Sequence, residues 1–301
     1  MITVGLIVGG LVVFFAVWLW QRQPKSEIET IGTAKEELKV DQKEEFQITP
    51  TEGSVLGSKK ASFEGKTKPQ SRVLIFSNDF QTVVASDDAG SFKQDVSLVS
   101  DLNQVDIVVL APDLSQVLKK SLNLYVTSEK ILGNQVLANT VRAILDNVIT
   151  IAYQGAEKSI LISKSTTVDL PEDVSDEDSG ATTSATASIR VGDFIIALGD
   201  PKDKESLSAK KVQIIREGKP QNNIQFVVAK ILTVPKQNSF SVKSNSDSKI
   251  IELTLSKTSQ VSQDDKVGSV ADIAKEKTAI VFYHADTGKK VVDSIYLLPQ
   301  R

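Results

Sequence analysis

Hydrophobic positions at the start of the chain follow one another without a polar break. Residues 2–20 read ITVGLIVGGLVVFFAVWLW, carry no charge and end in Trp18 and Trp20, just before Arg22 and Lys25. At 1.5 Å per residue a helix of this length spans roughly 28 Å, close to the roughly 30 Å hydrocarbon core of a bilayer. Tryptophan rings favour the headgroup boundary. The pattern predicts a transmembrane anchor over residues 1–20 that contacts membrane lipid through residues 2–20.

Two other interpretations of this run stay open. A cleaved signal peptide has a basic start, an apolar stretch of about 7–15 residues and a small-residue cleavage site, whereas this run is longer and ends in WLWQRQPK. A buried core helix normally keeps a polar face, and this run has none. Arg22 and Lys25 alone favour a cytoplasmic body, but long domains can translocate despite local charge. Together with the resemblances below, we expect a single-pass protein of the cytoplasmic membrane with an extracytoplasmic body.

Beyond the apolar run the polarity pattern changes twice. Residues 21–45 are charged and poor in aromatic residues, which is typical of a solvated stalk or linker. From residue 46 to 127, apolar and polar positions alternate in short runs separated by turn residues such as Lys68-Pro69-Gln70-Ser71 and Asp88-Ala89-Gly90. Short strands at this spacing predict a β-sandwich over residues 46–127.

The same stretch resembles bacterial immunoglobulin-like domains over about 80 residues. The similarity lies in a Gly-x-Thr-x-Pro turn, an Asp-x-x-Gly-x-Phe reversal, a Leu-Asn pair near the next turn and a final strand with tyrosine. The resemblance implies structural roles, in turns and core, for Gly65, Thr67, Pro69, Asp87, Gly90, Phe92, Leu102, Asn103 and Tyr125.

The remainder of the chain reads as two related halves. The first contains VRAILDNVITI, ILISKSTTV, VGDFIIALG and LSAKKVQII; the second contains VAKILTVPKQNSFSV, IIELTLSKTSQV, KTAIVFYH and VVDSIYLL. Segment order and a Ser-Lys-Ser-Thr or Ser-Lys-Thr-Ser element recur in register, which predicts a duplicated unit. We expect one copy over residues 130–217 and the other over residues 222–301.

Each half resembles small β-barrel domains of unknown function that are common in bacterial envelope proteins. The matching positions in the first copy are Val191, Gly192, Asp193, Gly199, Leu207 and Ala209. The second copy has Lys275-Glu276-Lys277 in place of Val-Gly-Asp. The expected fold class is therefore mainly β: a single N-terminal transmembrane helix, an immunoglobulin-like β-sandwich and two small β-barrel-like domains.

An acidic, then Ser/Thr/Ala-rich segment at residues 171–188 interrupts the first copy and is expected to be a disordered loop. Carboxylates in and before it could bind calcium, but they lack the alternating spacing and central glycine of a calcium loop. A solvated loop is the favoured interpretation for Asp169, Glu172, Asp173, Asp176, Glu177 and Asp178, and a turn-forming role for Asp79, Asp87 and Asp88.

Other candidate chemistry has a structural explanation. His284 is the only histidine and follows an apolar strand, so we expect a strand-end residue. Ser-x-x-Lys occurs twice outside any helix start, where chance explains it. Four aromatic residues could stack on sugars, but their alternation with polar neighbours favours a core role. The Ser-x-x-Lys pairs are Ser208 with Lys211 and Ser246 with Lys249. The aromatic residues are Phe76, Phe80, Phe282 and Tyr296.

Composition limits the possible functions. With 35 basic and 38 acidic residues, no global field points to nucleic acid, which we therefore exclude as a partner. The absence of cysteine excludes disulfides, cysteine-bound zinc, thiol catalysis and a lipoprotein anchor. We expect no catalytic, metal or cofactor residues and no cofactor.

The expected function is that of a non-catalytic spacer and interaction module of the bacterial cell envelope, with an envelope protein or a cell-wall polysaccharide as possible partner. Two alternatives stay open: a carbohydrate- or peptidoglycan-binding accessory module, and a carboxylate-based hydrolase.

Overall fold

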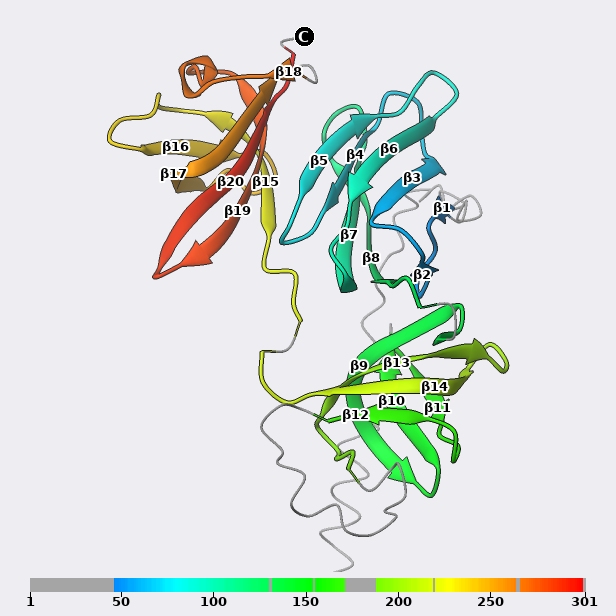
Figure 1. Ribbon diagram of the computed structural model, residues 1–301. Coiled ribbons are helices and arrows are strands. Elements are labelled where there is room, and N and C mark those ends of the chain that lie inside the picture. The colour runs from blue at the N-terminus through cyan, green and yellow to red at the C-terminus, as the bar shows by residue number, and fades with distance from the viewer. Residues whose placement is uncertain are drawn as a thin grey trace, which may run out of the picture. The chain divides into compact units, whose positions relative to one another are not determined.

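The structure is a computed structural model that describes residues 46–129, 132–153, 155–170, 188–218, 220–263 and 266–299. Phe46–Arg301 forms one compact unit, built almost entirely from β-strands (Figure 1). None of the described residues belongs to a helix long and apolar enough to cross a membrane. The expected anchor at residues 2–20, the stalk at 21–45 and nearly all of the expected loop at 171–188 lie outside the described residues.

The first part of this unit is a two-sheet sandwich. One sheet has the order β1-β3-β6 and the other β2-β8-β7-β4-β5, and β2 runs parallel to β8. The strands are β1 (Ile48–Thr49), β2 (Val55–Leu56), β3 (Lys60–Lys66), β4 (Arg72–Phe76), β5 (Gln81–Ala85), β6 (Ser91–Ser97), β7 (Asp101–Leu110) and β8 (Gln116–Val126).

The alternating residues of these strands fill the space between the two sheets. Phe63, Ile75, Phe92, Ile107 and Leu124 belong to one buried cluster, as the period of two predicts.

In the sandwich, side chains of Asp87 and Asn103 form hydrogen bonds with the backbone of nearby turn residues. Asp87 Oδ1 accepts hydrogen bonds from the backbone N–H groups of Ala89 and Ser91 at 2.9 and 2.8 Å, which confirms its turn role. Buried Asn103 accepts one from Val99 N at 3.0 Å and donates to Val99 O at 2.9 Å.

The second part is a closed five-stranded barrel, here called barrel 1. Its strands follow the order β11-β10-β9-β13-β14, and a parallel pairing of β14 with β11 closes the barrel. Short β12 continues along β14 beyond the third strand. The bounds are β9 (Gln135–Leu145), β10 (Val148–Tyr153), β11 (Ala156–Leu161), β12 (Thr167–Asp169), β13 (Phe194–Pro201) and β14 (Ser206–Ile215).

The third part, barrel 2, repeats this arrangement. Its order is β16-β15-β19-β20-β17, closed by pairing of β16 with β17. The bounds are β15 (Gln225–Ile231), β16 (Ser239–Ser244), β17 (Ile250–Gln263), β18 (Lys266–Val267), η3 (Val270–Asp272), β19 (Thr278–Asp286) and β20 (Lys289–Leu297). In both barrels strands one to three form a meander, strand five pairs in parallel with strand three, and strand four joins five to one. This is the topology of the OB fold, a five-stranded Greek-key barrel.

Two hydrogen bonds lie at equivalent positions of the two barrels. The Ser-Lys-Ser-Thr and Ser-Lys-Thr-Ser elements both lie where the third strand bends. There Thr166 Oγ1 donates to Ala209 O at 2.7 Å, and Ser259 Oγ donates to Val292 O at 2.6 Å. Both barrels also carry a register irregularity in strand four, at Leu198/Gly199 and at Phe282/Tyr283. In both barrels the recurring element therefore forms a hydrogen bond from the bend of the third strand to the fifth strand.

The Val-Gly-Asp turn of barrel 1 has a structural counterpart in barrel 2. Gly192 N donates to Val141 O at 3.0 Å, and Glu276 N donates to Ile231 O at 2.9 Å. Gly192 has φ +96° and Glu276 has φ +72°, so both occupy the left-handed region that favours glycine. The second copy thus keeps the turn with a residue whose side chain disfavours it.

Strands one and four of both barrels are apolar on their outer as well as their inner faces. In barrel 1 the outer residues Val136, Ala138, Phe194, Ile196 and Leu198 are buried. In barrel 2 the corresponding outer face includes the buried Val228, Ile280 and Phe282. The covering surface is the sandwich in both cases, and it sets the geometry of the sites described next.

Candidate functional site

Barrel 2 packs on the outer face of the five-stranded sheet of the sandwich through an apolar cluster. Leu74, Phe76 and Leu110 of the sandwich contact the outer face of barrel 2. The ring centroid of Phe282 lies 5.2 Å from that of Phe76 and 5.9 Å from that of Tyr296. Phe76 and Phe282 are core residues, as expected, but the core they occupy lies between two domains rather than within one.

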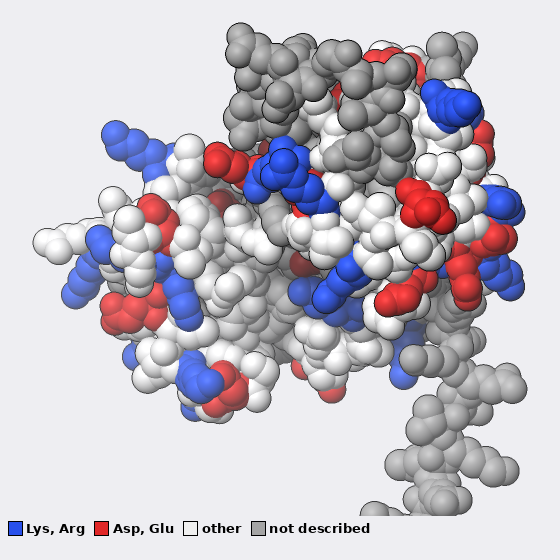
Figure 2. All heavy atoms as spheres, turned by 90° about the horizontal axis from the view of Figure 1, so that it is seen from below, with Lys and Arg blue, Asp and Glu red and all other residues white. Residues whose placement is uncertain are grey.

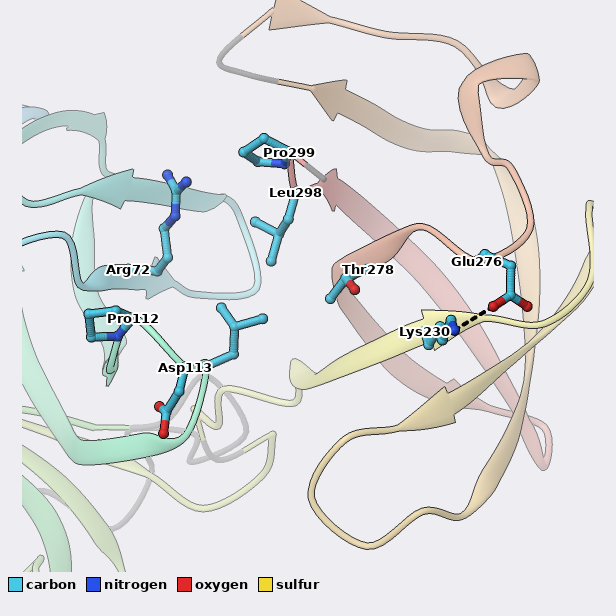
Figure 3. A pocket seen from close by; sticks show the side chains of 9 residues that line it. Arg72, Pro112, Asp113, Lys230, Glu276, Thr278, Leu298 and Pro299 are labelled. Atoms are coloured by element: carbon cyan, nitrogen blue, oxygen red, sulfur yellow. Dashed lines mark ion pairs between the residues drawn. The ribbon is translucent and has the colours of Figure 1, made fainter. Parts of the chain in front are cut away.

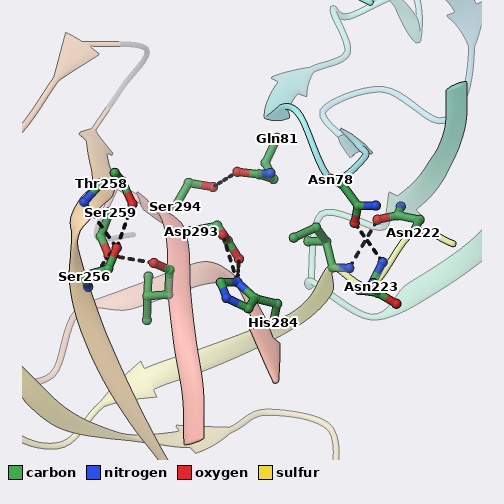
Figure 4. A network of polar contacts seen from close by, with 12 residues as sticks. Asn78, Gln81, Asn222, Asn223, Ser256, Thr258, Ser259, His284, Asp293 and Ser294 are labelled. Atoms are coloured by element: carbon green, nitrogen blue, oxygen red, sulfur yellow. Dashed lines mark hydrogen bonds and ion pairs between the residues drawn. The ribbon is translucent and has the colours of Figure 1, made fainter. Parts of the chain in front are cut away.

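Polar contacts surround this cluster (Figure 4). Asn78 Nδ2 donates to Gln221 O at 2.6 Å, and Asn78 Oδ1 accepts a hydrogen bond from Asn223 N at 2.9 Å. Asn222 Nδ2 donates to Phe76 O at 3.2 Å, and Tyr296 OH donates to Gln81 O at 2.6 Å. The segment between the two barrels is therefore bound to the turn that follows β4.

Barrel 1 packs on the other end of the same sheet. Leu102, Tyr125 and Val55 contact its outer residues. Gly53 O accepts a hydrogen bond from Val136 N at 2.7 Å, and a side chain at Gly53 (φ +78°) would place its Cβ 2.9 Å from Val136 O. Leu102 and Tyr125, which the family resemblance places in the turns and core of the sandwich, thus serve this interface.

Glu52 is a half-buried carboxylate that contacts both the sandwich and barrel 1. Asn123 N donates to Glu52 Oε2 at 2.8 Å, Asn123 Nδ2 donates to Oε1 at 3.1 Å, and Tyr153 OH also donates to Oε1. Desolvation raises the pKa of Glu52 even though these donors oppose the shift. Burial and the neighbouring Glu52 charge raise the pKa of Tyr153 as well. Sequence analysis missed Glu52, because nothing in Pro50-Thr51-Glu52-Gly53 marks it as an interface residue.

A cavity of about 550 Å³ lies where the turn after β7 meets barrel 2 (Figure 3). Arg72, Asp113 and Leu114 line it from the sandwich, and Lys230, Thr278 and Leu298 line it from barrel 2. A neighbouring cavity of about 480 Å³ shares Asp113 and Leu114. No sequence pattern indicates these cavities, because their walls come from segments more than 100 positions apart in the chain.

The acidic candidates do not gather into a metal site within the described residues. Among those residues no group of three or more His, Cys, Asp or Glu side chains is placed to hold a metal ion. Asp169 lies 2.9 Å from Lys211 Nζ, while Glu172, Asp173, Asp176, Glu177 and Asp178 lie outside the described residues. Asp79 and Asp88 are exposed in or near turns.

His284 is half-buried in β19, and its Nδ1–H donates to Asp293 Oδ2 at 2.9 Å (Figure 4). At the equivalent place in barrel 1, Lys210 Nζ lies 2.7 Å from Asp200 Oδ2. Both pairs join strand four to strand five next to the shared irregularity, so the histidine occupies a position that carries a cross-strand pair in both barrels.

The remaining candidates have local partners. Lys211 binds Asp169, and Lys249 Nζ lies 3.0 Å from Asp247 Oδ2. Ser208 is exposed in β14, and Ser246 Oγ lies 3.0 Å from Ser244 Oγ. Phe80 is half-buried against the sandwich core. On the face seen in Figure 2, basic and acidic side chains are interspersed.

Comparison with known proteins yields no family. No protein-family profile matches the sequence, and no curated protein matches it either. Three similar solved structures are a multidomain protein with nucleic acid binding domains from Streptococcus pneumoniae, the CSD456 segment of Drosophila Unr and a bacterial ice-binding adhesin. They share 13%, 8% and 9% identity, with TM-scores of 0.15, 0.20 and 0.20.

The matches differ in coverage. The first covers 56% of this chain and 45% of its own length, so this chain spans less than half of that protein. The second covers 78% of this chain and 99% of its own length, and the third covers 82% of this chain and 95% of its own length.

One expectation is wrong. We excluded nucleic acid as a partner from the even charge balance, but both barrels have the strand order of OB folds, and some OB folds bind oligonucleotides. Net charge is a property of the whole chain and does not describe one face of a small barrel. The exclusion of nucleic acid therefore does not stand.

Proposed function

We propose that this protein is a non-catalytic, membrane-anchored spacer and interaction module of the bacterial cell envelope. Residues 2–20 would be the anchor, residues 21–45 the stalk, and the body would lie outside the cytoplasm. The observation that carries the proposal is the packing of both barrels, through the same outer apolar face, on one sheet of the sandwich. Apolar contact of this kind stabilises a fixed arrangement of domains, which suits presentation of surfaces to a partner.

The proposal includes a sandwich of the bacterial immunoglobulin-like type over residues 46–127 and barrel domains over residues 130–217 and 222–301. Support comes from the division of the sandwich into two sheets, β1-β3-β6 and β2-β8-β7-β4-β5. In the second sheet β2 pairs in parallel with β8, the last strand of the sandwich.

Localisation tests the anchor and the orientation. The full chain should fractionate with membranes, and a variant without residues 2–20 should be soluble. Protease added to spheroplasts should degrade residues 46–301. Recovery of the intact full chain in the soluble fraction without detergent would contradict the anchor, and protection of the body in spheroplasts would contradict the orientation.

A second candidate function is an oligosaccharide-binding accessory module. It is favoured by one observation: the sandwich covers strands one and four of each barrel, whereas OB folds bind ligands on the face of strands two and three. In barrel 2 that face carries Ser241, Lys243 and Glu252.

Titration of the full chain with peptidoglycan fragments, with single-stranded DNA and RNA as parallel ligands, tests this candidate. Saccharide binding that is lost in Lys243→Ala would support it, and the exposed Lys202→Ala in barrel 1 is the matched control. Absence of saccharide binding, or binding of nucleic acid alone, would contradict it.

A further inference from the structure

One of the side chains that line the cavity between the sandwich and barrel 2 is an arginine without an acidic partner among the described residues. Arg72 is half-buried at the start of β4, and its side chain makes no ion pair or hydrogen bond within the described residues. Buried or half-buried guanidinium groups are normally paired, because desolvating a charge is costly. Arg72 also lines an adjacent cavity of about 140 Å³, so it stands at the junction of two hollows.

The acidic groups of the same cavity are already bound elsewhere. Asp113 Oδ1 accepts hydrogen bonds from Ser115 N at 3.0 Å and Ser115 Oγ at 2.6 Å. In Figure 3 the Asp113 carboxylate points away from Arg72, and Glu276 pairs with Lys230 at the far end of the cavity. Arg72 is thus the lining cation that has no acidic partner among the described residues.

Apolar side chains complete the wall around Arg72. Leu298 and Pro299 line both cavities together with Arg72 and lie across from it in Figure 3. Leu114 lines the cavity from the turn after β7 and has φ +69°, an unfavourable conformation for leucine. Packing against barrel 2 holds it there. Strained residues of this kind often line ligand sites.

We propose that this cavity binds a small carboxylic acid with an apolar side group. The planar Arg72 guanidinium would bind the carboxylate through two parallel hydrogen bonds, and Leu114, Leu298 and Pro299 would contact the apolar group. The volume of about 550 Å³ falls in the range of roughly 300–1,000 Å³ typical of small-molecule sites. The proposal goes beyond the spacer role and does not depend on the anchor or on the exposed barrel faces.

Saturation-transfer NMR on the full chain tests this site with two probes that differ only in charge, N-acetyl-leucine and N-acetyl-leucine amide. The acid should bind, and the amide should bind at least about tenfold more weakly, the effect of roughly 1.4 kcal/mol. Arg72→Gln should weaken binding of the acid to the same extent, whereas Arg142→Gln, at an exposed arginine of barrel 1, should leave it unchanged.

Leu298→Ala provides a second test that does not alter the cation, and it should weaken binding of both probes. A circular dichroism melt of each variant separates loss of fold from loss of binding. Equal binding of acid and amide, unchanged binding in folded Arg72→Gln, or no binding of the acid at millimolar concentration would overturn the proposal. None of these outcomes would bear on membrane localisation.

Discussion

Glu276 shows how one residue can carry a conformational cost within an otherwise equivalent turn. Its φ of +72° matches the glycine conformation of barrel 1, and its side chain pairs with Lys230 on the surface. An exposed ion pair contributes little, whereas a left-handed backbone disfavours any residue with a Cβ.

Glu276→Gly should therefore raise the thermal midpoint of unfolding, by about 2 °C or more for a protein of this size. Differential scanning calorimetry measures the shift. The reverse change in the equivalent turn, Gly192→Ala, should lower the midpoint. A lower midpoint for Glu276→Gly would mean that the ion pair outweighs the backbone cost.

Glu52 predicts a pH dependence at the barrel 1 interface. Burial raises the pKa of Glu52, so the folded state binds the proton more tightly than the unfolded state does. This contribution to stability is fully present below the unfolded pKa of about 4.3 and is lost as pH rises through the higher folded value.

Glu52→Gln should remove that dependence. The unfolding free energy of the wild-type protein, relative to the variant, should fall as pH rises from about 4 towards neutrality. Urea titrations at several pH values measure it, and Glu157→Gln, at an exposed site on β11, is the control. A wild-type protein that gains relative stability as pH rises would contradict the interpretation.

At the scale of elements, the period of two predicted the strands of the sandwich, and the duplicated motifs predicted two related barrels. The strands FIIAL and AIVFY are apolar at successive positions, and this pattern indicated burial without indicating its two sides. One side faces the barrel interior and the other faces the sandwich. The second contact could not be predicted, because no local pattern specifies which distant surface covers an apolar face.

The cavity lined by Arg72 could not be predicted from the sequence for a related reason. Arg72 follows a turn and resembles any exposed arginine at the start of a strand. It lines the cavity together with Leu298 and Pro299, which lie more than 200 positions later in the chain. The Ser-Lys-Ser-Thr element, in contrast, was visible in the sequence because its role is repeated.

The bend of the third strand should depend on one buried hydroxyl group. Thr166 Oγ1 donates to Ala209 O at 2.7 Å and accepts from Ser163 N at 2.9 Å. Thr166→Val keeps the shape and leaves both backbone groups unpaired, at a cost of about 1–3 kcal/mol. Chemical denaturation measures the loss. Thr167→Val, at the exposed neighbouring position, should change stability by less than about 0.5 kcal/mol, and equal losses in the two variants would contradict the role of this hydroxyl.

At the scale of the molecule, barrel 2 should depend on Phe282 for its position. Phe282 is fully buried in the cluster shared with the sandwich, on the outer face of the barrel. Phe282→Asp places an unpaired charge in that cluster, which is strongly disfavoured. The least costly response is separation of the two surfaces, so the barrel should stay folded while it leaves the sandwich. Faster hydrogen exchange confined to β4 and β19 would report this separation, and uniform acceleration across barrel 2 would mean unfolding instead.

The central claim is that the sandwich and both barrels form one body with fixed internal geometry. The chain has no cysteine, so spin labels can be placed on engineered pairs at exposed Ser97, Arg142 and Lys243, one in each domain. Pulsed electron spin resonance on the full chain should give one narrow distance distribution for each pair, and Phe282→Asp should broaden only the pairs that include Lys243. Broad distributions for every pair in the unmodified background would show domains that move independently and would contradict the account.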